Sequence, residues 1–505
     1  MSAPPLPSGN DRPVSPPTAR PNILFLMTDQ HRGDCIGADG NKVIRTPNID
    51  RLAAEGARFA RAYTSTPSCT PARAAILTGL SPWHHGLLGA GRQAETYKPE
   101  LPAMLRDAGY YTYGIGKMHF HPQRALHGFE RTILDESGRE ESPEFRSDYR
   151  SWFWSLAPTL DPGATGLGWN DYRARPYALP EKLHPTRWTA DAAVSFLKDY
   201  KEDKPFFLKV SFERPHSPYD PPPRFWKMYE DADVPPAVIG DWSARYAADT
   251  DPSNYNSWHG DFGPEQVRVS RRAYYGSISF IDEQIGRILK TLEERGWLDS
   301  TLILFTADHG DMLGDHHLWR KTYAYEGSAR IPMLVRWPEN MEAKRGQVFD
   351  QPTELRDLLP TFLDAAGVKF DPSQFDGQSL LKLVRGETDD WRPWIDLEHS
   401  QCYGSAGYWN ALTDGRIKYV FYALDGRQYL FDMAKDPGEL HNLADDPAHA
   451  ELLGTWRSRL MLHLNERGEP FVKDGDLVVG RPNVTYSPHF PWSNTGAPAS
   501  ARKRR

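Results

Sequence analysis

The sequence predicts an α/β fold: a large, doubly wound and mostly parallel sheet flanked by helices, followed by a smaller C-terminal antiparallel sheet with a helix. Three observations lead to this prediction. Short apolar runs rich in branched and aromatic residues recur along the chain, helical periodicity lies between them, and Asp-Gly turn signals separate three runs near the C-terminus. With 39% hydrophobic residues over 505 positions, the chain can bury a large core.

Five apolar runs have the pattern of strands that are buried on both faces of a sheet. Each run is short and contains several Val, Ile, Leu, Phe or Tyr residues, as the strands of a parallel sheet do. We therefore expect parallel strands over 22–29, 110–116, 205–212, 301–308 and 332–337.

Helical patterns lie between the predicted strands. One helix begins with Thr46 as its N-cap and Pro47 at the first helical position, where no N–H is needed. Apolar residues also recur at spacings of three and four over 187–200, 274–296 and 354–367, and the last two segments end in Gly. Strands that alternate with helices are typical of a doubly wound sheet.

Two stretches depart from this alternation. Residues 220–265 are dense in Pro, Asp, Trp and Tyr, so we expect a long irregular insertion that lines the pocket. After residue 375, the three runs with Asp-Gly turns predict an antiparallel meander, and a helix follows over 450–468. The predicted organisation is a disordered leader (1–20), a catalytic domain (21–375), a smaller C-terminal α+β unit (376–480) and a tail (481–505).

Charge and apolar content exclude several classes of protein. The formal charge is -7, without the excess of Lys and Arg that nucleic-acid binders carry, so nucleic acid is not an expected partner. No stretch approaches the roughly 18 apolar residues that cross a bilayer, and residues 1–20 lack the apolar core of a secretory signal. We expect a soluble protein without a membrane partner. It is cytoplasmic, or periplasmic or secreted if a signal peptide has been removed.

The cysteines are few and scattered. Cys35, Cys69 and Cys402 form an odd, sparse set, which argues against a disulfide framework and against a thiolate zinc site. Any cysteine with a special role therefore acts alone.

Cys69 has the features of a nucleophile. Pro71 suits the first turn of a helix through 72–79, so Cys69 lies at a helix N-terminus, where backbone N–H groups favour negative charge. A cysteine hydrolase with His119 or His216 as its base fits these features, and the residues alone do not exclude it.

Four of the predicted strands end in candidate catalytic groups. The carboxyl ends of the strands are where ligands bind in an open α/β sheet, because loops and helix N-termini converge there. One strand that ends in such a residue is weak evidence for a site, but four such strands together indicate one. In chain order, the groups are Asp29 and Gln30, then Lys117 and His119, then His216, and finally Asp308 and His309, with Lys321 soon after.

Asp29, Gln30, Asp308 and His309 together predict a site for a divalent cation. Their carboxylate and amide oxygens favour a hard ion, Ca²⁺ or Mg²⁺, whereas the imidazole moves the preference toward Mn²⁺. Taken singly, the Asp-Gln and Asp-His pairs could equally cap helices after strands. The prediction therefore depends on all four residues.

These motifs and their order resemble the type I, formylglycine-dependent sulfatases of the alkaline-phosphatase-like superfamily. The resemblance covers roughly residues 21–470 and implies the alkaline-phosphatase-like fold. The matching motifs are Asp-Gln at 29–30, Cys-Thr-Pro-Ala-Arg at 69–73 with the following Leu-Thr-Gly, Gly-Lys-x-His at 116–119, Pro-His-x-Pro-Tyr at 215–219, and Asp-His-Gly at 308–310 followed by Lys321.

The resemblance implies how the nucleophile and the metal site arise. A separate formylglycine-generating enzyme would convert Cys69 into Cα-formylglycine, whose hydrated aldehyde attacks sulfur and forms a covalent formylglycine-sulfate intermediate. The family also implies Ca²⁺ as the preferred cation, with Mg²⁺ or Mn²⁺ as alternatives. Its ligands would be Asp29, Gln30, Asp308, His309 and the modified Cys69.

The resemblance also implies roles for the remaining motif residues. Arg73 and Lys117 would hold the diol and its growing charge. His119 would take the proton from the second hydroxyl, so that the intermediate collapses to aldehyde and free sulfate. His216 and Lys321 would protonate the leaving oxygen and contact the sulfate.

Substrate contacts are expected from residues that flank the motifs on predicted loops, namely His31, Arg32 and His317. The implied activity is hydrolysis of a sulfate monoester to an alcohol and inorganic sulfate. Sulfated carbohydrates, aryl sulfates and small alkyl sulfates such as choline sulfate all remain candidate substrates.

Two other functions compete with this interpretation. Phosphonate monoester or phosphodiester hydrolases of the same superfamily also use formylglycine, often with Asp-Gln and Asp-His at the metal, but they generally lack the lysine and histidine found here at 117 and 119. A non-catalytic sulfoglycan-binding relative would be expected to have lost Cys69 or a metal ligand. Every one of those positions is filled, so a sulfatase is the favoured prediction.

Overall fold

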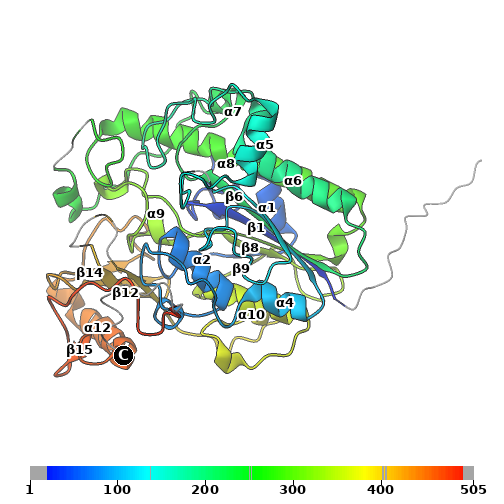
Figure 1. Cartoon of the computed structure of the whole chain (residues 1–505). Coiled ribbons are helices and arrows are strands. Elements are labelled where there is room, and N and C mark those ends of the chain that lie inside the picture. The colour runs from blue at the N-terminus through cyan, green and yellow to red at the C-terminus, as the bar shows by residue number, and fades with distance from the viewer. Residues whose placement is uncertain are drawn as a thin grey trace, which may run out of the picture.

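An eight-stranded mixed sheet forms the centre of the computed structural model, which describes residues 20–136, 138–248, 251, 253–400, 403 and 407–492. The strand order is β5-β4-β6-β1-β7-β8-β2-β9. Figure 1 labels β6, β1, β8 and β9 of this sheet, which follow one another in that sequence. The predicted leader, apart from residue 20, and residues 493–505 of the predicted tail lie outside the described part of the chain.

Four of the five predicted strands form the parallel middle of this sheet. Every residue of β6 and β7 is buried, because helices cover both faces, and this explains the continuous apolar runs in the sequence. The four strands are β1 (Asn22–Asp29), β4 (Tyr111–Gly116), β6 (Phe206–Pro215) and β7 (Thr301–Ala307). Shorter strands β2 (Ala57–Phe59), β5 (Arg131–Leu134) and β9 (Gln347–Phe349) complete the sheet with β8.

The fifth strand, β8 (Met333–Arg336), corrects one prediction. The run 332–337 is expected to be parallel, but β8 is antiparallel to β7 and to β2. Residues 308–332, all of which are described, form only the short helices η5 (Asp315–His317) and α9 (Glu326–Ala329). Without a crossover helix, the chain does not return to the starting edge of the sheet, and the next strand runs in the opposite direction.

Helices cover both faces of the sheet (Figure 1). Leu24 and Leu26 of β1 face one core, whereas Phe25 and Met27 face the other, as the period of two in a strand requires. This two-sided cover is the predicted doubly wound arrangement. The first core is closed by α1 (Pro47–Ala54), α6 (Pro185–Asp199) and α8 (Gly263–Glu294), and the second by α2 (Cys69–Thr78), α4 (Leu101–Asp107) and α10 (Leu358–Ala365).

The remaining elements of the catalytic region are short. The predicted insertion over 220–265 contains α7 (Pro223–Met228), the turn η3 (Ser243–Tyr246) and, from Gly263, the start of α8, and its other described residues are irregular, as predicted. The other short elements are α3 (Pro82–His85), α5 (Asp148–Leu156), α11 (Leu380–Val384), β3 (Ala62–Tyr63), β10 (Thr353–Glu354), η1 (Gly37–Asp39), η2 (Glu181–Leu183), η4 (Leu298–Ser300), η6 (Leu355–Asp357) and η7 (Pro372–Gln374).

A second sheet of four antiparallel strands follows, with a helix packed on it through Trp456 and Leu460. Three of its strands and the helix match the predicted meander. Its first strand is not predicted, because Asp396, Glu398 and His399 interrupt the apolar run. The elements are β11 (Ile395–His399), β12 (Trp409–Thr413), β13 (Ile417–Tyr422), β14 (Gln428–Asp432), η8 (Pro447–His449), α12 (Ala450–Leu464), η9 (Asn465–Arg467), and the hairpin β15 (Val472–Lys473) and β16 (Asp476–Leu477).

Residues 481–492 are expected to begin a tail, but they pack against the body of the protein. Leu87 forms a bridge with Tyr486, and the Leu88 amide donates to the Thr485 carbonyl at 2.9 Å. Phe490 is buried. Among the helices of the described chain, none combines the length and the apolar character needed to cross a membrane.

Candidate active site

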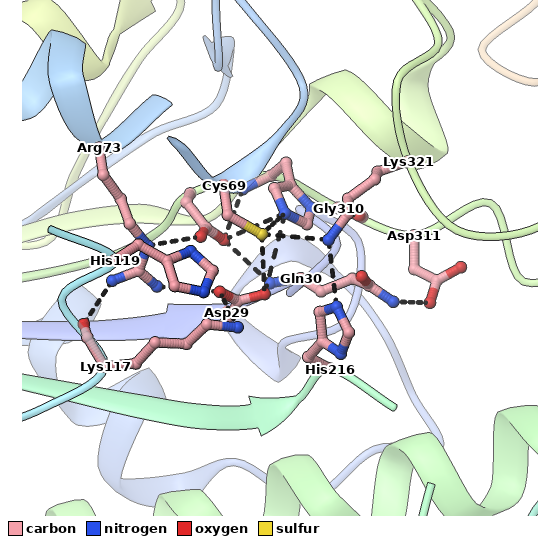
Figure 2. A network of polar contacts seen from close by, with 12 residues as sticks. Asp29, Gln30, Cys69, Arg73, Lys117, His119, His216, Gly310, Asp311 and Lys321 are labelled. Carbon is pink, nitrogen blue, oxygen red and sulfur yellow. Dashed lines mark hydrogen bonds and ion pairs between the residues drawn. The ribbon is translucent and has the colours of Figure 1, made fainter. Parts of the chain in front are cut away.

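The carboxyl ends of β1, β4, β6 and β7 bring the predicted residues together in front of the N-terminus of α2 (Figure 2). Asp29 closes β1, and His216 directly follows β6. Gly116 closes β4 with a φ of 92°, and a Cβ atom there would lie 2.1 Å from the Ser211 carbonyl oxygen, so only glycine allows the turn that presents Lys117. The parallel strand ends thus form one site, as the sequence predicts.

Cys69 lies at the centre of this cluster. It is the first residue of α2 and is 1% exposed. Its Sγ lies 3.1 Å from Lys321 Nζ and 3.1 Å from His309 Nε2 (Figure 2). Burial and Asp29 act to raise the pKa of the Cys69 thiol, but Lys321, His309 and Lys117 outweigh them and lower it to about 7. The position therefore favours an anionic group.

The Asp29 carboxylate holds two cationic side chains. Arg73 Nη2 and Lys117 Nζ lie 2.9 Å and 2.8 Å from Asp29 Oδ2, and Arg73 Nε also donates to Asp308 Oδ2 at 3.0 Å. Burial alone would raise the pKa of Asp29, but Lys117, His216 and Arg73 hold it well below its ordinary value. The buried charges are thereby compensated and fixed in place.

Four groups are close enough to share a metal ion. Asp29, Cys69, Asp308 and His309 each offer a ligand atom, and these atoms all lie within 4.8 Å of one another. His309 Nδ1 lies 2.9 Å from the Gly310 carbonyl oxygen, so Nδ1 carries a proton and Nε2 is the ring nitrogen that faces Cys69. The donor set of two carboxylates and one imidazole fits a divalent cation.

Gln30 provides a further oxygen beside these groups. Asp311 Oδ2 accepts a hydrogen bond of 2.6 Å from Gln30 Nε2, which fixes the orientation of the amide. The buried Oε1 atom has no hydrogen-bond partner within the described chain. The Gln30 backbone N–H donates to Asp308 Oδ1 at 3.0 Å, and an orphaned amide oxygen on this residue is consistent with a role as a metal ligand. Asp311 directly follows the Asp-His-Gly motif, so its position in the sequence could have indicated its role.

His119 is held by Glu136 in an uncommon backbone conformation. Glu136 Oε1 accepts the backbone N–H groups of Met118 and His119 at 2.8 Å each, and His119 has a φ of 59°. Both ring nitrogens of His119 lack hydrogen-bond partners among the described residues. Burial and Lys117 lower the pKa of His119 well below its ordinary value, so the imidazole is neutral and can accept a proton.

His216 lies between Lys321 and an indole ring. Its Nε2 is 3.1 Å from Lys321 Nζ, and its Nδ1 is 2.8 Å from the Ser217 carbonyl oxygen. The Trp169 ring stacks on it, with centroids 4.2 Å apart and an interplanar angle of 25°, and Lys117 Nζ lies 4.4 Å from the Trp169 ring centroid. Trp169 is not predicted, because it lies in an irregular segment that carries no motif.

The three predicted substrate contacts lie in different surroundings. Both ring nitrogens of the buried His31 face protein atoms, at 3.2 Å from Thr28 Oγ1 and 3.0 Å from the Cys35 carbonyl oxygen. The Arg32 guanidinium forms ion pairs of 2.7 Å with two acidic residues, Asp34 and Asp315. His317 lies on η5 and is partly exposed. Contact of these residues with substrate stays a prediction.

Comparison with protein families gives two matches. The family model described as Sulfatase matches residues 21–368. A second model, described as N-sulphoglucosamine sulphohydrolase, C-terminal, matches residues 314–466. The first match spans the sheet and all motif residues of the cluster.

Similar proteins cover nearly the whole chain. An arylsulfatase of Clostridium perfringens is 39% identical, over 92% of this chain and 99% of its own length. A choline-sulfatase of Rhizobium meliloti is 33% identical, over 85% of this chain and 83% of its own length.

Solved structures share the fold. A phosphonate monoester hydrolase of Agrobacterium radiobacter has a TM-score of 0.74 at 25% identity, covering 93% of this chain and 100% of its own. A second structure, in complex with its substrate D-glucosamine-2-N,6-O-disulfate, has a TM-score of 0.73 at 25% identity, covering 89% of this chain and 98% of its own. These similarities confirm the predicted alkaline-phosphatase-like architecture.

Proposed function

Because the chain belongs to the sulfatase family, we propose that it hydrolyses a sulfate monoester to an alcohol and inorganic sulfate, with residue 69 as the source of the nucleophile. The observation that carries this proposal is the environment of Cys69. Its Sγ lies at the start of α2, within 3.1 Å of both Lys321 and His309. Arg73 and Lys117 add positive charge nearby, which suits an anionic substrate and a nucleophile that gains charge.

In this proposal, a formylglycine-generating enzyme first converts Cys69 by replacing its sulfur with oxygen, so Sγ stands in for an oxygen bonded to Cβ of the modified residue. The hydrated aldehyde supplies the oxygen that forms a bond to sulfur while the bond from sulfur to the ester oxygen breaks. His119 then accepts the proton of the second hydroxyl, sulfate leaves as the aldehyde returns, and water hydrates the aldehyde again. The neutral, buried imidazole of His119 supports its role as this base.

His216 and Lys321 would donate the proton that the departing alcohol oxygen needs. Their nitrogens lie 3.1 Å apart, and Lys321 also reaches Cys69, so both face the position of the sulfate group. Arg73 is fixed by Asp29 and Asp308 and would stabilise the growing negative charge on the nucleophile.

Asp29, Gln30, Asp308, His309 and the modified residue 69 would hold a divalent cation. We propose Ca²⁺, with Mg²⁺ or Mn²⁺ as alternatives, because carboxylate and amide oxygens outnumber the single imidazole. When bound, the cation supplies positive charge that lowers the pKa of the nucleophilic hydroxyl and neutralises sulfate oxygens.

Release of inorganic sulfate tests the proposal. The protein is coexpressed with a formylglycine-generating enzyme and assayed with 4-nitrophenyl sulfate, choline sulfate and glucosamine 6-O-sulfate, with Cys69→Ala as the matched control. We expect the unsubstituted protein to release sulfate and Cys69→Ala to lose at least about 10⁴-fold of that activity, since it lacks the nucleophile. If no sulfate is released from any substrate of a broad panel, a non-catalytic sulfoglycan-binding role is favoured instead.

A phosphonate monoester hydrolase is the second candidate function. It is supported by the structural neighbour of that activity and by the Asp-Gln and Asp-His pairs at the metal site. Comparing the turnover of 4-nitrophenyl sulfate with that of a phenyl phosphonate ester separates the two. We expect the sulfate to be the better substrate, with some activity on the phosphonate because both substrates are tetrahedral oxyanion esters.

A further inference from the structure

Arg320, the residue before Lys321, carries a buried guanidinium whose donors the protein leaves unused. The residue is 7% exposed. Its Nε and Nη2 atoms have no hydrogen-bond partner in the described part of the chain. These two atoms bear the parallel N–H groups on one edge of the guanidinium, which is the edge that binds a carboxylate or sulfate through two hydrogen bonds.

Other buried arginines of this protein are paired with acidic side chains. A buried cation without an anion is destabilising, and a carboxylate usually compensates it. No described carboxylate lies within salt-bridge distance of Arg320, so the missing anion has to come from elsewhere. The buried arginines that do have a carboxylate partner include Arg214 with Glu213, Arg271 with Asp315, Arg356 with Asp396, and Arg467 with Glu398.

The backbone fixes Arg320 beside the catalytic cluster. Its N–H donates to Asp311 Oδ1 at 2.9 Å, and the other oxygen of Asp311 orients Gln30. Lys321, the next residue, reaches Cys69. Arg320 has a φ of 65°, a left-handed conformation that non-glycine residues adopt where surrounding contacts enforce it, often at functional sites.

One aromatic ring lies beside the guanidinium, and a second ring from another segment stacks on the first. The Arg320 guanidinium lies 5.1 Å from the ring centroid of Tyr403, a residue between β11 and β12. Trp258, from the insertion over 220–265, stacks on Tyr403 with ring centroids 6.0 Å apart and an interplanar angle of 18°. Both rings are partly exposed. Stacked aromatic faces beside a cationic donor edge suit a sugar or aryl ring that carries an acidic substituent.

We propose that Arg320 forms a second anion subsite, which binds a carboxylate or sulfate group on the alcohol part of the substrate. Lys321 and His216 face the sulfate group that is cleaved, and Arg320 holds the group that is not. This inference rests on the proposed sulfatase function and narrows its substrates to sulfate esters with a second acidic group. A cationic substrate such as choline sulfate is disfavoured, because it brings like charge toward the guanidinium.

Two matched pairs of substrates test this subsite. The first pair is carboxyphenyl sulfate and carbamoylphenyl sulfate, as 3- and 4-isomers, which have nearly the same shape and differ in one charge. The second pair is D-glucosamine-2-N,6-O-disulfate and N-acetylglucosamine 6-O-sulfate, whose acetamide group is uncharged. We expect kcat/KM for the acidic member to exceed that for its partner by at least about tenfold, mainly through KM, because the extra contact is made before the reaction as well as during it.

Substitution of Arg320 should abolish this preference. In Arg320→Met, we expect the ratio of kcat/KM between acidic and neutral members to fall to about one, and in Arg320→Lys to an intermediate value, since lysine keeps the charge but not the paired donors. Arg106→Met, which removes an exposed arginine paired with Asp107, is the control and should keep the ratio of the unsubstituted protein. The ratio can be measured on any residual activity, so reduced expression of a variant does not obscure it.

The outcomes distinguish this inference from the proposed function. If the unsubstituted protein hydrolyses the neutral members but does not prefer the acidic ones, or if Arg320→Met keeps the preference in both pairs, the subsite is disproved and the sulfatase function stands. If neither member of either pair releases sulfate but choline sulfate or 4-nitrophenyl sulfate does, the subsite is disproved and the sulfatase function stands. If no substrate releases sulfate, the proposed function fails and the subsite fails with it.

Discussion

Lys321 and Arg320 are neighbours in the chain, yet the cationic nitrogen atoms of their side chains differ in whether they have protein partners. Lys321 Nζ lies 3.1 Å from both Cys69 Sγ and His216 Nε2, whereas the Nε and Nη2 atoms of Arg320 have no partner in the described residues. A group that acts on the reacting atoms benefits from being fixed before the substrate arrives. A group that selects the substrate has to keep its donors available. In the proposed function, this contrast corresponds to two roles: Lys321 acts in catalysis, and Arg320 selects the substrate.

After loss of the nucleophile itself, removing Lys321 gives the largest expected effect. Lys321→Ala should lower kcat/KM by about 10³-fold for the acidic and the neutral member of each substrate pair alike, because it takes away charge that both reactions need at the sulfate group. Steady-state kinetics on the four substrates measure this. A loss confined to the acidic members would instead place Lys321 with Arg320 in substrate selection.

Removing the Trp169 ring should have a smaller effect that depends on the leaving group. Trp169 stacks on His216, so Trp169→Ala should weaken proton donation to the leaving oxygen. We expect a loss of about 10²-fold with an alkyl sulfate but only about tenfold with 4-nitrophenyl sulfate, whose phenolate leaves without much protonation. Trp169→Phe should restore most of the activity. Equal losses on both substrates would indicate that Trp169 supports only the structure.

Metal binding should show its effect in the stability of the protein instead of its activity. If Asp29, Asp308 and His309 hold Ca²⁺, then Ca²⁺ at about 100 times its Kd stabilises the folded protein by about 2.7 kcal/mol. Thermal unfolding of chelator-treated protein, with and without added Ca²⁺, measures this. The variant Asp308→Asn should show a reduced shift in Tm, and a full shift in that variant would place the ion elsewhere.

The sequence predicts the proposed catalytic residues better than it predicts the residue proposed to select the substrate. Asp29, Lys117, His216 and Asp308 follow strands, and parallel strands place their carboxyl ends together whatever the loops do. Their convergence could therefore be predicted from strand patterns alone. The direction of β8 could not be predicted in this way, because an apolar run indicates that a strand is buried but does not indicate whether it runs parallel or antiparallel to its neighbour.

Residues in loops were harder to predict, because their roles depend on where side chains point. His31 and Arg32 lie next to Asp29 and Gln30 in the sequence, but the chain turns so that both bind protein atoms. Trp169 and Arg320 lie in irregular segments, and their contacts come from residues far away in the chain. Sequence spacing carries no information about such contacts.

Mass analysis of the peptide that contains residue 69, combined with activity, decides whether a modified Cys69 is the nucleophile. In protein coexpressed with a formylglycine-generating enzyme, we predict a peptide about 18 Da lighter than its cysteine form, and sulfate release that rises in proportion to the lighter fraction and resists iodoacetamide. Full activity in protein whose residue 69 is entirely cysteine, with loss of that activity on treatment with iodoacetamide, would contradict the account and identify a thiol nucleophile instead.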